Sequence, residues 1–317
     1  MNGKLIKPEI LILSTDAEDY LPLLQELSVP AIDIHLATTI DEARDAYSGQ
    51  PVILGQPDLV AGVLNEMPGV RWIQSSWAGV TPLIDLGRTD YLLTGIKDTF
   101  GLQMAEYVLA YLLAHEIRIF ERLTRQANRN WWDQTSGTLN GKALGIMGTG
   151  SIGRHIAKMA KPFGMRVTGF SRSGSPVDGF RQVFAQHQLE EFLQAPDYIV
   201  GVLPDTAGSQ NLLDATAFRA MKDGCYLVNV GRGKLIDEAA LVDALQAGKL
   251  AGAVLDVFRT EPLPDDSVLW NAPGLIVTGH VAAISWPRDI ARVFGENYQR
   301  FVAGEPLKYR IDFEKGY

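Results

Sequence analysis

The segment Lys142–Gly153, K-A-L-G-I-M-G-T-G-S-I-G, restricts the possible folds more than any other part of this chain. Its apolar run Ala143–Met147 predicts a buried strand, and the residues from Ile152 onward predict a helix. Between them three glycines follow the spacing G-x-G-x-x-G: Gly148, Gly150 and Gly153. The first permits a tight turn, the second lets a pyrophosphate approach the backbone, and the third lets helix and strand pack closely. Because a helix N-terminus attracts phosphate, this unit predicts dinucleotide binding.

The bulk properties of the chain bound its class. At 317 residues it is long for one core, so two domains are expected. A formal net charge of -8 disfavours general binding to nucleic acid or to an anionic membrane, because like charges repel. No stretch reaches the roughly 18 apolar residues of a membrane span, and the N-terminal apolar run is too short for a signal peptide. We therefore expect a cytoplasmic location.

The chain has one cysteine, Cys225, inside the apolar run C-Y-L-V-N-V. A single cysteine excludes a disulfide framework and a cysteine-based zinc cluster, and we expect no metal site. A nucleophilic role is formally open, but the apolar setting favours a small core residue.

Short apolar runs alternate with helical patterns, which predicts βαβ units and parallel sheets. In the first hundred residues the expected strands are Ile10–Ser14, Ala31–Leu36, Val52–Leu54, Arg71–Ser75 and Tyr91–Thr94. The expected helices between them are Asp19–Leu27, Ile40–Tyr47, Pro57–Asn65 and Val80–Leu86. This part is therefore expected to form one α/β domain, without a phosphate-binding fingerprint of its own.

Met104–Leu123 follows and predicts a single long helix that is apolar around much of its circumference. Such a helix is buried on several sides, between domains or between subunits. Trp131 and Trp132 come next in a polar loop. Because exposed adjacent tryptophans are costly, we expect them to cap the core or to contact a partner chain.

From Ala143 the alternation of strands and helices resumes. The expected strands are Ala143–Met147, Arg166–Phe170, Tyr198–Val202, Cys225–Val230, Ala251–Val257 and Leu275–Thr278. The expected helices lie near Ile152–Phe163, Leu189–Gln194, Ala215–Met221, Glu238–Ala247 and Pro287–Ala303. Six strands with the fingerprint after the first indicate a Rossmann domain. The last helix follows the sixth strand and is a candidate to cross back to the first domain.

Three polar side chains follow the last three strands of this predicted sheet: Arg232, Glu261 and His280. Ligands of open parallel sheets bind beyond the carboxyl ends of the strands, where these residues are expected to meet. A guanidinium can bind a carboxylate and polarise a neighbouring carbonyl, and an imidazole oriented by a carboxylate can exchange a hydroxyl proton. Each residue also has a structural interpretation, as a turn residue, a solvated charge or a core histidine. Their shared position favours hydride transfer involving a 2-keto acid.

The chain resembles the D-isomer-specific 2-hydroxyacid dehydrogenase family over essentially its full length. The motifs that carry the resemblance are G-T-G-S-I-G, L-P-D-T at Leu203–Thr206, N-V-G-R-G-K-L-I-D at Asn229–Asp237, L-D-V-F-R-T-E-P-L-P at Leu255–Pro264 and T-G-H-V-A-A at Thr278–Ala283. The resemblance implies that Arg232, Glu261 and His280 are catalytic. It also implies two Rossmann-like, doubly wound parallel-sheet domains: a flavodoxin-like substrate domain, 1–100 completed by 286–317, and a dinucleotide-binding domain, 101–285.

The resemblance further implies the ligand contacts and the assembly. Substrate would contact Arg232 and the loop W-I-Q-S-S-W-A-G-V, where Ala78 and Gly79 would offer N–H groups to a carboxylate and Trp77 would shape the pocket. The chain would form a homodimer through its cofactor domain. Cofactor contacts are expected at Gly148, Thr149, Gly150, Ser151, Ile152, Gly153, Ser171, Arg172, Ser173, Leu203, Pro204, Thr206, Val230, Gly231 and Asp256.

Three positions depart from the family pattern. Gly279 stands where a proline often precedes the histidine, which is expected to loosen that turn, and Ser209 is a mild change in the L-P-x-T-x-x-T segment. The third departure is at Ser171–Ser173, where NAD-preferring members carry an acidic residue that binds the ribose hydroxyls. Arg172 can pair with a 2′-phosphate instead, and the two hydroxyls can donate to it. We therefore expect NADP(H) to be preferred, with NAD(H) possible.

These features favour an NADPH-dependent 2-keto acid reductase, similar to glyoxylate/hydroxypyruvate reductases. Two alternatives stay open: oxidation of phosphite or of another 2-hydroxy acid, and a nucleotide-sensing, corepressor-like binding role. Formate oxidation is disfavoured because formate-type chemistry resembles family members that carry Gln beside the histidine, and this chain carries Glu261. Which keto acid fits depends on Trp77 and Trp286, and on Trp131 or Trp132 of a neighbouring subunit.

Overall fold

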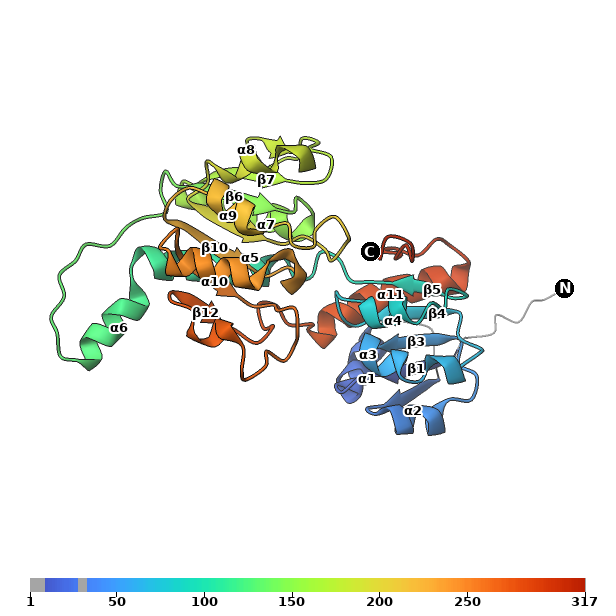
Figure 1. The fold of residues 1–317 in the computed structure, drawn as a ribbon. Coiled ribbons are helices and arrows are strands. Elements are labelled where there is room, and N and C mark those ends of the chain that lie inside the picture. Colours follow the sequence, from blue (N-terminus) through green and yellow to red (C-terminus); the bar gives the residue numbers. More distant parts are fainter. Residues whose placement is uncertain (1–8, 28–32, 317) are drawn as a thin grey trace. The chain divides into compact units, whose positions relative to one another are not determined.

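The computed structural model describes residues 9–27 and 33–316. The described residues fall into two compact units (Figure 1). Those of Met1–Thr99 and Ser285–Tyr317 form the first unit, and those of Phe100–Ile284 form the second unit. Each unit contains a sheet in which every strand pairing is parallel.

The first unit is built on a five-stranded sheet of order β2-β1-β3-β4-β5, which is the flavodoxin-like order. The strands are β1 Ile10–Leu13, β2 Ile34–Ala37, β3 Val52–Gly55, β4 Trp72–Ser75 and β5 Leu92–Thr94. Every residue of β1, β3 and β4 is buried, as expected for apolar runs covered on both faces of a parallel sheet. The start of the strand expected at Ala31–Leu36 lies outside the described residues.

The helices of the first unit are α1 Ala17–Glu26, α2 Ile40–Ala46, α3 Pro57–Ala61, α4 Thr81–Asp85 and α11 Pro287–Ala303. α11 returns from the second unit and packs against α1. Phe294 of α11 stacks on Trp72 of β4, with 5.2 Å between ring centroids. The helix expected at Pro57–Asn65 is wrong in its length, because α3 ends before Gly62 and a separate 3₁₀ turn covers Leu64–Glu66.

The second unit is built on a seven-stranded sheet of order β12-β11-β10-β9-β6-β7-β8. Its strands are β6 Ala143–Met147, β7 Arg166–Phe170, β8 Val183–Phe184, β9 Tyr198–Gly201, β10 Cys225–Asn229, β11 Leu250–Leu255 and β12 Leu275–Val277. The prediction of two doubly wound parallel sheets is confirmed. The prediction of six strands missed β8, whose two residues are too few to produce a recognisable apolar pattern.

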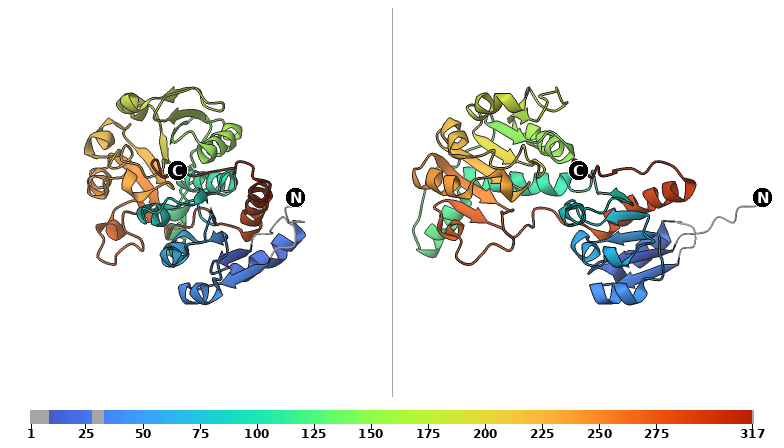
Figure 2. Two further views of the ribbon diagram at one scale, coloured as in Figure 1. Left: turned by 90° about the vertical axis from the view of Figure 1, so that its right-hand side faces the viewer. Right: turned by 45° about the vertical axis from the view of Figure 1, so that its right-hand side comes forward.

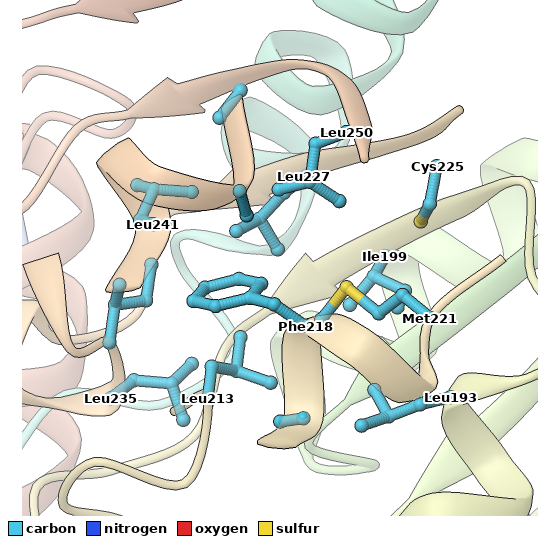
Figure 3. Packing of buried hydrophobic residues seen from close by; sticks show 14 of the residues in the cluster. Leu193, Ile199, Leu213, Phe218, Met221, Cys225, Leu227, Leu235, Leu241 and Leu250 are labelled. Atoms are coloured by element: carbon cyan, nitrogen blue, oxygen red, sulfur yellow. The ribbon is translucent and has the colours of Figure 1, made fainter. Parts of the chain in front are cut away.

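Two hydrophobic clusters hold most helices of the second unit on its sheet. The helices are α5 Gly101–Glu116, α6 Ile119–Ala127, α7 Ser151–Ala160, α8 Leu189–Leu193, α9 Ala215–Ala220 and α10 Glu238–Gln246. One cluster joins α5 and α7 to the sheet, and the other joins α8, α9 and α10 to it. In the latter cluster Phe218 of α9 lies among Leu227, Leu241 and Met221 (Figure 3). Cys225 belongs to the same cluster, is fully buried, and burial raises the pKa of its thiol to about 12.

The single helix expected at Met104–Leu123 is wrong. α5 ends at Glu116, Arg118 adopts a left-handed conformation with φ 56°, and α6 begins at Ile119. α5 buries apolar side chains, whereas α6 has no buried residue. The apolar pattern continues across the break, but the burial of apolar side chains does not. α6 and the chain after it project from the body of the second unit (Figures 1 and 2).

Trp131 and Trp132 do not cap a hydrophobic core, so that part of the expectation is also wrong. Trp131 is 94% exposed. Trp132 packs under guanidinium groups of α6 and its N-cap, with 5.3–5.7 Å between each guanidinium carbon and the ring centroid: Arg118, Arg122 and Arg125. These cation–π contacts fold the chain after α6 back onto that helix. We name residues 118–136 the arm.

Two further kinds of feature are absent from the described residues. Their helices lack the combination of length and hydropathy that a membrane span needs. They also contain no group of three or more His, Cys, Asp or Glu side chains arranged to hold a metal ion.

Candidate active site

Arg232, Glu261 and His280 lie in the loops that leave β10, β11 and β12. These strands are neighbours in the sheet and run parallel, so their carboxyl ends share one edge. The structure therefore brings together the three side chains that the sequence pattern singled out.

Glu261 and His280 form a direct pair. The Nδ1 atom of His280 lies 2.7 Å from Oε2 of Glu261, and Oε1 of Glu261 accepts the N–H of Phe258 at 2.8 Å. Because a carboxylate only accepts, Nδ1 carries the proton and Nε2 is directed away from the pair. The His280 side chain is 53% exposed. An imidazole held in this way presents one ring nitrogen to a ligand.

The backbone around His280 is held by Asp256. His280 has a φ of 57°, a left-handed conformation that costs a non-glycine residue about 1–2 kcal/mol. Its N–H donates to the carbonyl oxygen of Asp256 at 2.8 Å. The Asp256 side chain, 1% exposed, accepts the N–H groups of Val281 and Ala282, each at 2.9 Å. These bonds hold the turn that Gly279 was expected to loosen.

Arg232 lies in a loop that only glycines on both sides permit. A Cβ on Gly233 would lie 1.9 Å from the carbonyl carbon of Phe258, so the loops after β10 and β11 are in close contact. The guanidinium donates to the carbonyl oxygen of Gly231 at 2.7 Å. Burial lowers the pKa of Arg232, while the charges of Glu261 and Asp205 oppose that shift. Arginine stays charged, so this desolvated cation is suited to bind an anion.

Asn229 fixes this loop and was not singled out by its chemistry. It is fully buried at the end of β10. Its Nδ2 donates to the carbonyl oxygen of Arg232 at 3.0 Å, and its Oδ1 accepts the N–H of Gly231 at 3.2 Å. Its place beside the motif G-R-G was the only available signal.

Two glycines of the glycine loop are required by the local packing, and the third, Gly150, is not. Gly148 has a φ of 117°, and a Cβ on Gly153 would lie 1.9 Å from the Gly148 oxygen. By contrast, a Cβ on Gly150 would meet no atom within 4 Å. Gly150 is also the N-cap of α7 and brings no capping side chain. The loop therefore keeps open space beside a helix N-terminus, which fits a dinucleotide pyrophosphate. Thr149, Ser151 and Ile152 are half-buried in this loop.

The loop after β7 carries Ser171, Arg172 and Ser173. The Ser171 Oγ accepts the N–H of Gly174 at 3.1 Å, which leaves its own proton available to donate. The Ser173 hydroxyl donates to Ser175 Oγ at 2.9 Å. Arg172 is exposed. The turn thus holds a cation and hydroxyls, and no carboxylate, at the three positions expected to face the ribose.

The loop after β9 carries the expected cofactor contacts Leu203, Pro204 and Thr206. Ser209 closes this loop: its Oγ accepts the N–H of Thr206 at 2.9 Å and donates to the Pro204 oxygen at 2.6 Å. Ser209, which replaces the last threonine of the L-P-x-T-x-x-T pattern, therefore stabilises the conformation of this loop. Val230 and Gly231, two further predicted cofactor contacts, follow β10 and are both buried.

The expected substrate loop belongs to the first unit and follows β4. Ser75 Oγ donates to the Trp77 oxygen at 2.6 Å and accepts the Trp77 N–H at 3.1 Å, which fixes the turn. Trp77 is 39% exposed. Among the described residues, the N–H groups of Ala78 and Gly79 have no hydrogen-bond partner. Two adjacent N–H groups of this kind can bind a carboxylate.

A cavity of about 640 Å³ lies elsewhere in the second unit. Its lining includes Glu116, Lys142, Tyr198 and Tyr226, which lie near the amino ends of the strands. It is therefore at the sheet edge opposite Arg232, Glu261 and His280, and it is not part of the candidate active site.

Comparisons with known proteins agree with this geometry. The sequence profile described as "D-isomer specific 2-hydroxyacid dehydrogenase, NAD binding domain" matches residues 109–282. Glyoxylate/hydroxypyruvate reductase A of Klebsiella pneumoniae (strain 342) is 34% identical over 225 residues, which cover 70% of this chain and 72% of that protein.

Two solved structures extend the similarity over nearly the whole chain. A D-isomer specific 2-hydroxyacid dehydrogenase family protein from Aeromonas salmonicida is 41% identical, with a TM-score of 0.93 over 97% of this chain and 99% of that one. An NADPH-dependent glyoxylate/hydroxypyruvate reductase from Sinorhizobium meliloti, solved with NADP and sulfate, is 27% identical, with a TM-score of 0.86 over 98% and 100%.

Proposed function

The chain belongs to the D-isomer specific 2-hydroxyacid dehydrogenase family, a family of oxidoreductases that use NAD(P), and we propose that it reduces a small 2-keto acid with NADPH. The product is the D-2-hydroxy acid, and the substrates are of the glyoxylate and hydroxypyruvate type. The observation that carries the proposal is the His280–Glu261 pair, with 2.7 Å between Nδ1 and Oε2, at the sheet edge where the loop after β10 carries the half-buried guanidinium of Arg232.

The chain's own residues supply binding and the proton. NADPH, when bound, supplies the hydride that reaches the keto carbon. Arg232 binds the substrate carboxylate and polarises the adjacent carbonyl. Protonated His280 donates a proton from Nε2 to the carbonyl oxygen, which becomes the hydroxyl, while Glu261 holds Nδ1. His280 then regains a proton from solvent.

The substrate loop is a second part of the proposal. The N–H groups of Ala78 and Gly79, which lack partners among the described residues, are proposed ligands for a carboxylate. Trp77, whose turn Ser75 fixes, is proposed to limit the size of the substrate side chain.

The assay that tests the function is consumption of NADPH with a panel of substrates. Glyoxylate, hydroxypyruvate and pyruvate are each added to the purified protein with NADPH, and the loss of NADPH absorbance is followed. Turnover of at least one keto acid is expected. Binding of NADPH without turnover of any of them would favour the sensing role, and reduction of NADP by phosphite would favour the oxidative alternative.

NADP(H) is the proposed cofactor, because Arg172 and two serines stand where a carboxylate would bind the ribose hydroxyls. The Sinorhizobium meliloti reductase, with the same fold, is described as NADPH-dependent. NAD(H) remains an alternative cofactor for the same loop, with lower efficiency because it lacks the phosphate that Arg172 would bind.

Replacement of Arg172 by Ala is expected to lower kcat/KM for NADPH about 20-fold, the loss of one charged hydrogen-bonding partner. The kcat/KM for NADH should stay within about twofold, because NADH has no 2′-phosphate for Arg172 to bind. Steady-state kinetics with both cofactors measure the ratio. An equal fall for both cofactors, or a wild-type protein that uses NADH better, would contradict the assignment.

Gly150 and Gly153 offer a matched pair of variants for the cofactor loop. Gly150→Ala adds a methyl group where the protein has open space, so Tm should hold and the Kd for NADPH should rise roughly tenfold. Gly153→Ala forces a Cβ onto the Gly148 oxygen, so Tm should fall by about 5 °C. Thermal unfolding and fluorescence titration with NADPH separate the two effects. Unchanged NADPH affinity in Gly150→Ala would argue against this loop as the pyrophosphate site.

A homodimer is the proposed assembly, formed through the arm. α6 buries none of its residues, and its apolar side chains Ile119, Phe120 and Leu123 are 38–57% exposed. Trp131 adds a nearly fully exposed indole. Several exposed apolar side chains within one short segment are typical of an interface between protein chains.

Leu123→Glu is expected to shift the protein to a monomer, because a charge would be buried in that interface. Val268→Glu is the matched control, since Val268 is 63% exposed on the second unit outside the arm. Light scattering coupled to gel filtration gives the mass of each variant. A wild-type monomer, or a dimer that survives Leu123→Glu, would count against the arm as the interface.

A further inference from the structure

Two side chains on one face of α5 contact the segment that carries His280. Gln103 binds both backbone groups of Ile284: its Oε1 accepts the N–H at 2.9 Å, and its Nε2 donates to the carbonyl oxygen at 3.0 Å. One helical turn later, the Tyr107 hydroxyl lies 2.5 Å from Thr278 Oγ1. Residues 278–284 are therefore held by α5 at both ends.

The direction of the hydrogen bonds at Thr278 follows from the groups present. Thr278 Oγ1 lies 2.7 Å from Oδ1 of Asp256, and a carboxylate accepts, so the threonine proton goes to Asp256. Tyr107 must then donate to Thr278. Burial raises the pKa of Tyr107, so its hydroxyl keeps the proton that this bond requires. The result is a directed chain from Tyr107 through Thr278 to Asp256.

The series of hydrogen bonds from Tyr107 ends at Asp256, whose atoms hold the backbone conformation of His280. Asp256 accepts the backbone N–H groups of His280, Val281 and Ala282 through its carbonyl and its carboxylate. The left-handed conformation of His280 is disfavoured for a non-glycine residue, and it persists only where the surroundings impose it. Tyr107 fixes the carboxylate that imposes it, and Gln103 fixes the end of the same segment.

We propose that Tyr107 and Gln103 are positioning residues for His280, acting through Thr278–Asp256 and through Ile284 respectively. They hold the backbone that aims the imidazole, so that Nδ1 meets Glu261 while Nε2 meets the substrate oxygen. This inference rests on the proposed function, because it assigns no chemistry to either residue beyond aiming the proton donor. A purely structural role would stabilise the second unit without a specific link to proton donation.

A double-mutant cycle with His280 tests the link for Tyr107. Tyr107→Phe keeps the ring and removes the donor, and it should lower kcat about tenfold, the order expected from one lost buried hydrogen bond. The KM for NADPH should change less than kcat, because the glycine loop and the Ser171–Ser173 turn are untouched. In the His280→Ala background the same change should leave the residual kcat unaltered, because there is no imidazole left to aim.

Thr278 gives the conservative rescue. Thr278→Ser keeps the hydroxyl and should retain kcat, whereas Thr278→Val keeps the shape and should match Tyr107→Phe. Combining Tyr107→Phe with Thr278→Val should lower kcat no further than either change alone, because both interrupt the same series of hydrogen bonds. Gln103→Met, which keeps the length but neither hydrogen bond, should also lose kcat only when His280 is present.

Tyr198→Phe is the matched control. It removes a hydroxyl that donates to Glu116 near the amino end of β9, at the opposite sheet edge. It should lower Tm without changing kcat. An equal loss from Tyr107→Phe with and without His280 would overturn the positioning role alone. Full activity of His280→Ala would instead overturn the proposed function, so the two failures are distinguishable.

Discussion

Replacement of His280 by Ala is expected to lower kcat for keto-acid reduction about 10³-fold, the usual contribution of a positioned general acid. The loss should fall on turnover, because the imidazole donates its proton only as the hydride arrives. Affinity for NADPH should stay within about threefold, since the glycine loop and the Ser171–Ser173 turn are untouched. Steady-state kinetics and NADPH titration measure the two quantities separately.

Glu261→Gln and His35→Ala complete this experiment. Glu261→Gln removes the charge that faces Nδ1 but keeps the side-chain length, so an intermediate loss of kcat is expected. His35, in β2 of the first unit, also faces a carboxylate, with 3.6 Å between its Nε2 and Oε2 of Glu9. His35→Ala should leave kcat unchanged. A His280→Ala protein with near-normal turnover would remove His280 from the mechanism.

Replacement of Arg232 by Ala is the other change with a large expected effect, a fall of about 10³-fold in kcat/KM for the keto acid. The guanidinium is proposed to bind the substrate carboxylate and to polarise the carbonyl, so both binding and turnover should suffer. Arg232→Lys keeps the charge but loses the planar fork that matches a carboxylate, so it should recover only a small part of the activity.

Lys234 provides the control for charge alone. It lies two positions after Arg232 and pairs with Asp205 at 2.9 Å on the surface. Lys234→Ala removes one positive charge from the same loop, and its kcat/KM should stay within about twofold because surface pairs contribute little. If Lys234→Ala and Arg232→Ala had similar effects, the result would indicate a general electrostatic role and no specific carboxylate site.

The family, the two parallel sheets and the meeting of three catalytic candidates could be predicted because each depends on local pattern. Apolar runs such as Ala143–Met147 form strands wherever both sheet faces are covered. Parallel strands then place their following residues at one edge, so Arg232, Glu261 and His280 meet without any knowledge of packing.

The errors arose where packing overrode a local pattern. The apolar periodicity of α5 continues into α6, but the chain turns at Arg118 and no residue of α6 is buried. Trp131 and Trp132 follow that turn, and only the arrangement of Arg118, Arg122 and Arg125 shows how Trp132 is accommodated. The strand β8 was missed because two residues carry no periodicity.

The sequence by itself determined the strand–glycine-loop–helix unit, the sheet edge and the residue types that gather there. These follow from spacing within a few residues, which local sterics and strand direction convert into structure. Only the tertiary structure decided how His280 is aimed, because its supports are distant in the chain. Tyr107 and Thr278 are 171 positions apart, and Gln103 and Ile284 are 181 apart. Hydrogen bonds of this kind depend on how α5 lies beside the segment that follows β12, and no spacing in the sequence encodes that contact.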